Sequence, residues 1–310
     1  MKGKDQIMKS KHRILLVSDM HYTTEETREE LKQIDPTMNT SAAAGNAFGY
    51  TQREKIEKIY EAVIKEHQKA SLDAVLVLGD LSIDDYSFRN LPNYCQRFKE
   101  ECMDRFPCPS YAIPGNHDSY PDEMWQEVFG YGRQFAIEID DAVFLMLDVF
   151  CSAPADSASG SPLTPLDVSY LRRALEQYAG KKIFLCAHYF AERIFTEEVK
   201  EIIRNSPDIV CLFRGHTHKN GVCFLGEEYN HKALIDIGGY AYNGFCIDKK
   251  WIFDIFDFAW AWGYQILEWE GDSVHTYHIK PALHYKARNG EFDVEETVSG
   301  ITDFTILRKT

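Results

Sequence analysis

Residues 13–21 read RILLVSDMH, a short apolar run that stops abruptly at a polar cluster. Apolar runs of this length with polar boundaries are typical of strands that are buried on both faces. The cluster contains Asp19 and His21, a carboxylate and an imidazole separated by one residue. The stretch therefore predicts a buried strand with metal-competent side chains at its carboxyl end.

The same arrangement recurs four times along the chain. An apolar run again precedes polar residues in AVLVLGD (74–80), YAIPGNHD (111–118), IFLCAH (183–188) and IVCLFRGHTH (209–218). Apolar residues at helical spacing lie between these runs, at 53–69, 167–178 and 196–203. Alternating strands and helices indicate an α/β sheet core. Because ligands bind beyond the carboxyl ends of strands in such sheets, we expect the five polar clusters to form one site.

The last third of the chain has a different pattern. Strand-like runs occur at 221–225, 232–237, 262–268 and 274–279, and Gly271-Asp272 between the last two predicts a hairpin. We expect mixed and antiparallel strands that close a second sheet. We predict one domain over residues 10–280, with residues 281–310 as a C-terminal extension packed on it. Two long segments, 22–51 and 151–165, are either functional loops or surface insertions.

The charge balance narrows the range of partners. Lys and Arg number 34 against 48 Asp and Glu, so the formal net charge is -14. An acidic surface repels long polyanions, and no basic run is present, so the sequence disfavours nucleic acid as a partner. Bound metal ions reverse the local field, which leaves a small phosphorylated substrate as the expected partner.

The sequence also bears on location. Residues 1–13 are charged and lack the apolar segment of a signal peptide, and no run is long enough for a membrane span. The eight cysteines include no CxxC pair, which favours reduced thiols over a disulfide framework. We expect a cytoplasmic protein with no membrane contact, and the oligomeric state stays open.

Taken in order, the motifs resemble one family. Asp-x-His at 19–21, Gly-Asp at 79–80, Gly-Asn-His-Asp at 115–118, the lone His188 and Gly-His-x-His at 215–218 resemble the calcineurin-like metallophosphoesterase superfamily. Each motif alone is weak evidence for the family. Their occurrence together in this order, over about residues 14–218, is specific to it. The resemblance implies a four-layer α/β sandwich, in which helices flank two mixed β-sheets, and a dinuclear metal-dependent phosphoesterase.

The resemblance also implies a ligand for each metal position. The first ion would be bound by Asp19, His21 and His218, the second by Asn116, His188 and His216, and Asp80 would bridge both. Two cations about 3.5–4 Å apart repel each other, so a shared carboxylate is needed to keep both sites filled. Oxygen and imidazole ligands without thiolate suit divalent or trivalent Mn, Fe or Zn, and do not distinguish among them.

His117 would face the phosphate rather than a metal. A hydroxide bridging the two metals would attack phosphorus, and His117 would either donate a proton to the leaving oxygen or steady the charge that forms on it. Many family members orient this histidine with an acidic residue three positions after the bridging aspartate, but Ile83 stands there. Asp84 and Asp118 are the two candidates for that role. Substrate-binding residues stay unknown at this stage.

We therefore expect metal-dependent hydrolysis of a phosphodiester or phosphomonoester of a small molecule or nucleotide. One alternative is a protein-interaction scaffold that kept the fold and lost catalysis, which predicts missing ligands. All seven ligand residues are present. The other alternative is a nuclease, which the acidic balance disfavours.

Overall fold

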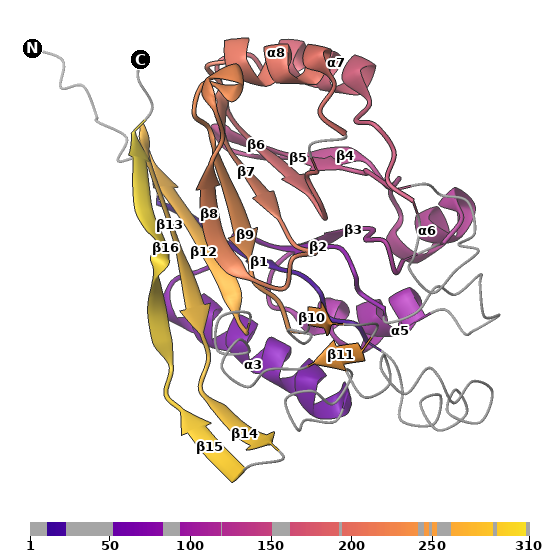
Figure 1. The fold of residues 1–310 in the computed structure, drawn as a ribbon, viewed down its shortest axis with the longest axis vertical. Coiled ribbons are helices and arrows are strands. Elements are labelled where there is room, and N and C mark those ends of the chain that lie inside the picture. The colour runs from indigo at the N-terminus through magenta and orange to yellow at the C-terminus, as the bar shows by residue number, and fades with distance from the viewer. Residues whose placement is uncertain are drawn as a thin grey trace, which may run out of the picture.

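Two six-stranded sheets face each other in the middle of the molecule, and helices cover their outer faces (Figure 1). The computed structural model describes residues 11–22, 52–82, 94–118, 120–150, 162–191, 194–240, 245–247, 250–252, 262–287 and 290–307. Both sheets contain parallel and antiparallel pairs. The predicted four-layer α/β sandwich is confirmed.

The first sheet has the order β16-β13-β12-β1-β2-β3. Its parallel half consists of β1 (His12–Val17), β2 (Ala74–Leu78) and β3 (Ser110–Ile113). Its antiparallel half consists of β12 (Tyr264–Glu270), β13 (Ser273–Lys280) and β16 (Thr297–Leu307). The hairpin expected at Gly271-Asp272 joins β12 to β13, and Gly271 has the left-handed backbone (φ 54°) that such a tight turn requires.

The second sheet has the order β4-β5-β6-β7-β9-β8. Its strands are β4 (Phe135–Ile139), β5 (Ala142–Leu147), β6 (Lys182–Ala187), β7 (Ile209–Arg214), β8 (Asn220–Phe224) and β9 (Ala233–Ile237). The expectation that all late strands close this sheet is wrong in part. Only β8 and β9 join it, whereas β12 pairs with the free edge of β1 and carries β13 and β16 into the first sheet.

Helices cover the outer face of each sheet (Figure 1). The first sheet is covered by α3 (Gln52–Lys69), α5 (Tyr94–Glu101) and α6 (Asp122–Phe129), and the second by α7 (Val168–Gln177) and α8 (Glu197–Asn205). Asp167 caps the amino end of α7, since its carboxylate accepts the Tyr170 N–H at 3.0 Å. Short hairpins complete the described fold, formed by β10 (Phe245–Ile247) with β11 (Lys250–Ile252) and by β14 (Leu283–Ala287) with β15 (Gly290–Val294).

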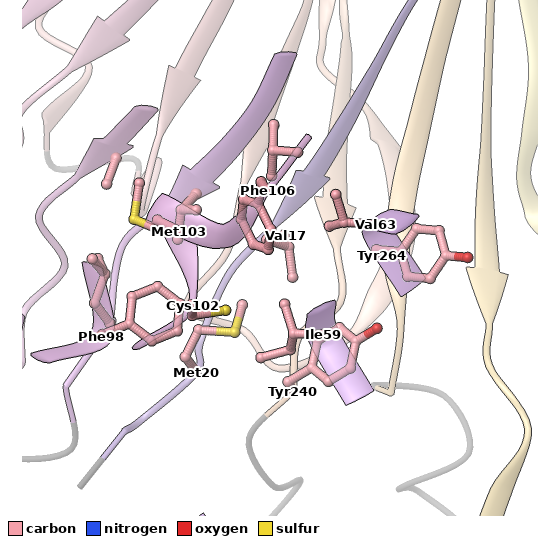
Figure 2. Packing of buried hydrophobic residues seen from close by; sticks show 14 of the residues in the cluster. Val17, Met20, Ile59, Val63, Phe98, Cys102, Met103, Phe106, Tyr240 and Tyr264 are labelled. Carbon is pink, nitrogen blue, oxygen red and sulfur yellow. The ribbon is translucent and has the colours of Figure 1, made fainter. Parts of the chain in front are cut away.

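Alternating side chains of the central strands fill two layers of core. In β1, Ile14 and Leu16 face the second sheet, while Leu15 and Val17 face the helices. Figure 2 shows the layer on the helix side, where Val17 lies among residues of α3 and α5 such as Ile59 and Phe98. Because both faces are buried, the strands are apolar throughout, which explains why the sequence shows continuous runs instead of polar–apolar alternation.

Several expectations fall outside what can be described. Residues 23–51 and 151–161, which make up most of the two long segments, lie outside the described residues. The predicted domain boundaries stay a prediction, although β16 from the proposed extension pairs with β13. None of the helices in the described part of the chain combines the length and apolar character that a membrane crossing needs. Cysteines with described side chains are free thiols, at positions 95, 102, 108, 186, 211 and 223.

The packing between the sheets generates a stability prediction. Phe184 of β6 is fully buried and stacks on Phe144 of β5 with ring centroids 4.9 Å apart. Phe184→Ala should lower the free energy of unfolding by about 3–5 kcal/mol, since it leaves a cavity in a closed layer. Chemical denaturation measures this change. Phe224→Ala is the control, because Phe224 of β8 is 65% exposed and should cost less than about 0.5 kcal/mol. Equal effects of the two changes would contradict the described core.

Candidate metal centre

The polar clusters of five strand ends meet where the two sheets adjoin. The first sheet contributes Asp19 and His21 after β1, Asp80 after β2 and Asn116 after β3, and the second contributes His188 after β6 and His216 and His218 after β7. Two groups of potential ligand atoms, each lying within 4.8 Å of one another, are formed by Asp19, His21, Asp80 and His218 and by Asp80, His188 and His216. Six of the seven predicted ligands therefore lie together, and Asp80 belongs to both groups. The seventh, Asn116, lies beside them, with its Oδ1 2.9 Å from Nδ1 of His216.

Asp80 occupies the shared position. Its Oδ1 accepts the His117 N–H at 2.9 Å, which fixes the carboxylate against the loop after β3. Its Oδ2 lies 3.6 Å from Nε2 of His21 and 3.1 Å from Nε2 of His188, one from each group. One oxygen is therefore anchored, and the other points between the two groups, as a bridging ligand requires.

Asp19 divides its two oxygens in the same way. Oδ2 accepts the Ser18 hydroxyl at 2.6 Å and the His216 N–H at 3.0 Å. Oδ1 lies 3.1 Å from Nε2 of His218, and Nε2 of His218 lies 3.2 Å from Nε2 of His21. Three potential ligand atoms from three residues thus surround a single point, while the second Asp19 oxygen holds the loops together.

The second group is ordered by contacts of its own. His188 Nδ1 donates to the Leu78 carbonyl at 2.6 Å, which turns Nε2 toward Asp80. His216 Nδ1 lies 2.9 Å from Oδ1 of Asn116, and the His188 and His216 rings meet edge to face at 5.2 Å. A histidine that donates from one ring nitrogen to a backbone carbonyl presents the other as a ligand, which is the usual arrangement at metal sites.

The loops that carry the ligands have unusual backbone conformations. Left-handed φ angles between 43° and 64° occur at Asp19, His21, Asp80, His216 and His218. Such angles are uncommon outside glycine and cluster at functional sites, where the surrounding structure must hold them. The backbone at Gly115 lies so close to Asp80 that only glycine fits, since a Cβ there would lie 2.1 Å from Oδ1 of Asp80. The strand-end motifs are therefore shaped to aim side chains inward.

The donor atoms fit metal ions. Metal–nitrogen bonds of about 2.0–2.1 Å in a tetrahedral site place neighbouring ligand atoms about 3.3 Å apart. The distances of 3.1 and 3.2 Å around Nε2 of His218 are close to that value. Asp19 Oδ1 and His188 Nε2 are buried, and each lies 3.1 Å from a neighbouring ligand atom without forming a well-aligned hydrogen bond within the described residues. A pair of cations would satisfy both atoms. The oxygen and nitrogen donor set suits Mn, Fe or Zn.

The electrostatics of the site favour cation binding. Burial opposes ionisation of Asp80, but the His188 and His117 imidazoles outweigh it and hold its pKa well below the usual range. Burial likewise acts against a charged His188, yet Asp80 and Asp19 raise its pKa to about 9. Burial lowers the pKa of His216 to about 4, so that this ring is neutral near neutral pH. Without metal, an ion pair between protonated His188 and Asp80 offsets part of the carboxylate charge. A metal ion bound by His188 would displace the proton from its imidazole.

The three candidate catalytic residues, His117, Asp84 and Asp118, differ in what the structure shows of them. His117 is half-buried, and its ring lies 5.1 Å from that of His21. Asp84 and Ile83 lie outside the described residues. Asp118 is fully buried and accepts the N–H groups of Gly115, Leu81 and Ser82 at 2.8–3.1 Å, so it ties the loop after β3 to the loop after β2. Its carboxylate therefore positions the segment that carries His117, and the role of Asp84 stays a prediction.

Sequence reasoning missed two of the residues that support the ligands, Asp236 and Thr217. Asp236 of β9 accepts hydrogen bonds from both Arg214 and Thr217, next to the histidines of the last motif. Tyr189 lies with its ring centroid 4.2 Å from that of His216. The one signal for Asp236 in the sequence is an aspartate inside the apolar run ALIDI at 233–237. A buried carboxylate within a central strand needs a partner, which is a reason to look for one.

Comparisons with known proteins agree with this geometry. The model of the calcineurin-like phosphoesterase family matches residues 12–220. A dimetal phosphatase from Danio rerio is 12% identical, with a TM-score of 0.57 and coverage of 94% of this chain and 98% of that chain. A structure of PhoD is 11% identical, with a TM-score of 0.54 and coverage of 97% of this chain and 72% of that chain. No curated protein matches in sequence at a significant level. At these identities the two structures show a shared fold.

The shared position of Asp80 leads to a prediction. Asp80→Asn should reduce the binding of both metal ions, since it removes charge from the one ligand that the two groups have in common. Metal content after loading with Mn and gel filtration, measured by inductively coupled plasma mass spectrometry, tests this. Asp140→Asn is a matched control, because Asp140 has a similar left-handed φ of 52° and lies outside both groups. Loss of a single ion from Asp80→Asn would contradict the shared position.

Proposed function

Because the chain belongs to the calcineurin-like phosphoesterase family, we propose that it hydrolyses a phosphodiester or phosphomonoester of a small molecule or nucleotide with the help of two metal ions. The observation that carries this proposal is the pair of ligand groups that share Asp80. Asp19, His21 and His218 would hold one ion, and Asn116, His188 and His216 the other. Mn, Fe and Zn all fit the donor set.

When bound, two such ions acidify water into a nucleophile and neutralise charge on the phosphate. The chain supplies the ordered surroundings. Asp19 and Asp80 each commit one oxygen to loop N–H or hydroxyl groups and leave the other for the metals. A site that is held in place before substrate arrives needs little rearrangement during the reaction, which is the main source of electrostatic catalysis.

His117 is the proposed acid. It directly follows the ligand Asn116, and its N–H is held by Asp80 at 2.9 Å. The Ser82 hydroxyl donates to the His117 carbonyl at 3.1 Å, so the peptide groups on both sides of the His117 Cα are held. A half-buried imidazole in this position can reach an incoming phosphate, donate a proton to the leaving oxygen and steady the charge that forms there.

A cavity on the α6 side of the proposed site has the size of a small-molecule pocket. It has a volume of about 570 Å³ and lies between α6 and the segment after β5, with Phe150 in its wall. The Phe150 ring centroid is 5.7 Å from that of His188. Ligand pockets for small molecules fall in the range of about 300–1,000 Å³. None of the seven proposed ligands lines this cavity, and Phe150 is the lining residue that contacts one of them. A cytoplasmic location belongs to the same proposal.

The alternatives receive less support. The scaffold reading predicts incomplete ligands, whereas all seven lie together in the described part of the chain. A nuclease would need a basic surface to hold the polyanion, and the net charge of the chain is -14. Hydrolysis of a small phosphate ester is therefore the function that the site supports best.

The direct test is an activity assay with defined metals. Purified protein stripped with a chelator and reloaded with Mn, Zn or Fe should hydrolyse bis-nitrophenyl phosphate or nitrophenyl phosphate, and the chelator should abolish turnover. Asp80→Asn prepared in parallel controls for contaminating enzymes. A protein that binds two metal ions but shows no chelator-sensitive turnover with either substrate would overturn the proposal.

The role of His117 gives a separate prediction. His117→Ala should lower kcat by about 10²–10⁴-fold for an alkyl phosphate ester, the usual contribution of an acid–base group, while metal content stays unchanged. The loss should shrink for nitrophenyl esters, because nitrophenolate leaves without protonation. His275→Ala, in β13, is the control for losing a histidine outside the site. An equal loss with both kinds of leaving group would exclude the proton-donor role.

A further inference from the structure

An ion pair outside the ligand set adjoins the last metal-binding motif. Arg214 ends β7 and is the register neighbour of Asp236 in the parallel strand β9. Its Nε and Nη2 donate to the two Asp236 oxygens at 2.6 and 3.1 Å. The Arg214 and Asp236 side chains are 17% and 12% exposed, so the pair is shielded from water. Two-pronged pairs of this kind are stronger and more directional than single hydrogen bonds.

Thr217 connects this pair to the ligands. Its hydroxyl donates to Oδ1 of Asp236 at 2.7 Å, the same oxygen that accepts Nε of Arg214. Thr217 stands between His216 and His218, which belong to different metal groups. A displacement of Thr217 would therefore move ligands of both ions.

A second contact from Arg214 reaches the other side of the motif. Its Nη1 donates to the Phe190 carbonyl at 2.9 Å, and its guanidinium lies 5.6 Å from the centre of the Tyr189 ring. That ring in turn packs against His216, at 4.2 Å between centroids. Arg214 thus links the segment after β6, which follows His188, to the segment after β7.

The motif needs such support because of its backbone. His216 and His218 both have left-handed φ angles, of 64° and 49°. Conformations of this kind cost on the order of 1–3 kcal/mol each and persist only where the surroundings hold them. The Thr217 N–H bonds locally, to the Gly215 carbonyl at 2.7 Å. The Thr217 hydroxyl ties this strained segment to Asp236 in strand β9, whereas His216 and His218 contact the loops after β1 and β3.

We propose that the Arg214–Asp236 pair holds residues 215–218 in their metal-binding conformation through the Thr217 hydroxyl. Arg214, Asp236 and Thr217 are positioning residues, since the ligand groups do not include them. The inference rests on the proposed dinuclear site, but it concerns the shape of the metal-free protein. It predicts that loss of this support weakens metal binding by about 10–100-fold, the range seen when partners of metal ligands are removed.

Two substitutions of Thr217 separate the role of its hydroxyl from the role of its shape. Thr217→Val keeps the branched shape and removes the hydroxyl, whereas Thr217→Ser keeps the hydroxyl. We expect Thr217→Val to bind Mn²⁺ about 10–100-fold more weakly than the wild type by calorimetry. Thr217→Ser should restore most of the affinity.

Asp141→Asn is the matched control for losing a carboxylate contact in the same sheet. Asp141 precedes β5 and pairs with Lys182 at the amino end of β6, at the opposite end of the strand from His188. Its substitution should leave Mn²⁺ affinity unchanged. If Asp141→Asn weakens binding as much as Thr217→Val, the effect is general destabilisation and the inference fails.

Hydrogen–deuterium exchange on metal-free protein gives a readout that requires neither metal nor activity. Peptides covering residues 214–220 should exchange faster in Thr217→Val than in the wild type or Thr217→Ser, while peptides from β1 and β2 stay unchanged. Wild-type exchange and Mn²⁺ affinity in Thr217→Val would overturn the inference and leave the proposed function standing. A wild-type protein that binds Mn²⁺ but hydrolyses no phosphate ester, with these shifts present, would overturn the function and leave the inference standing.

Discussion

The rest of the structure depends on two buried carboxylates placed where two sheets meet. Asp19 and Asp80 are 0% and 1% exposed, and removing such charges from water is costly unless a cation compensates. Imidazole groups surround both. The two carboxylates raise the pKa of His188 to about 9, whereas burial lowers the pKa values of His21 and His216, which leaves negative charge only partly balanced. A pair of bound cations would resolve this conflict. The ligand geometry and the shared place of Asp80 follow from the same requirement.

The two-sheet architecture makes such a site possible. Parallel strands from both sheets end at one edge, so loops that are far apart in sequence approach one another. Backbone bonds join these loops directly, as in the Asp19 N–H to the Gly79 carbonyl at 3.0 Å and the His21 N–H to the Asp80 carbonyl at 3.0 Å. Left-handed residues then turn the side chains inward, and the core on both faces of β1 and β2 holds the strand ends in place. The packed core thereby holds the strained, left-handed backbone of these loops in place.

The sequence predicts well which side chains come together at the candidate site, because each follows a buried apolar run closely, and that pattern is visible without tertiary information. It predicts their supports poorly. Asp236 lies inside a strand and meets Thr217 and Arg214 only when β7 and β9 pair. The placement of β12 beside β1 was also missed, since an apolar run indicates a strand but not the edge that it joins. The hairpin of β4 and β5 and the helices α5 and α6 were not predicted, and the role of Asp118 depends on loop contacts that a linear pattern does not contain.

Anomalous diffraction from crystals soaked in Mn²⁺ tests the central claim most directly. The account predicts two peaks, one on each side of Oδ2 of Asp80, with His21 and His218 beside the first and His188 and His216 beside the second. A single peak, or peaks that lie away from this carboxylate, would contradict it.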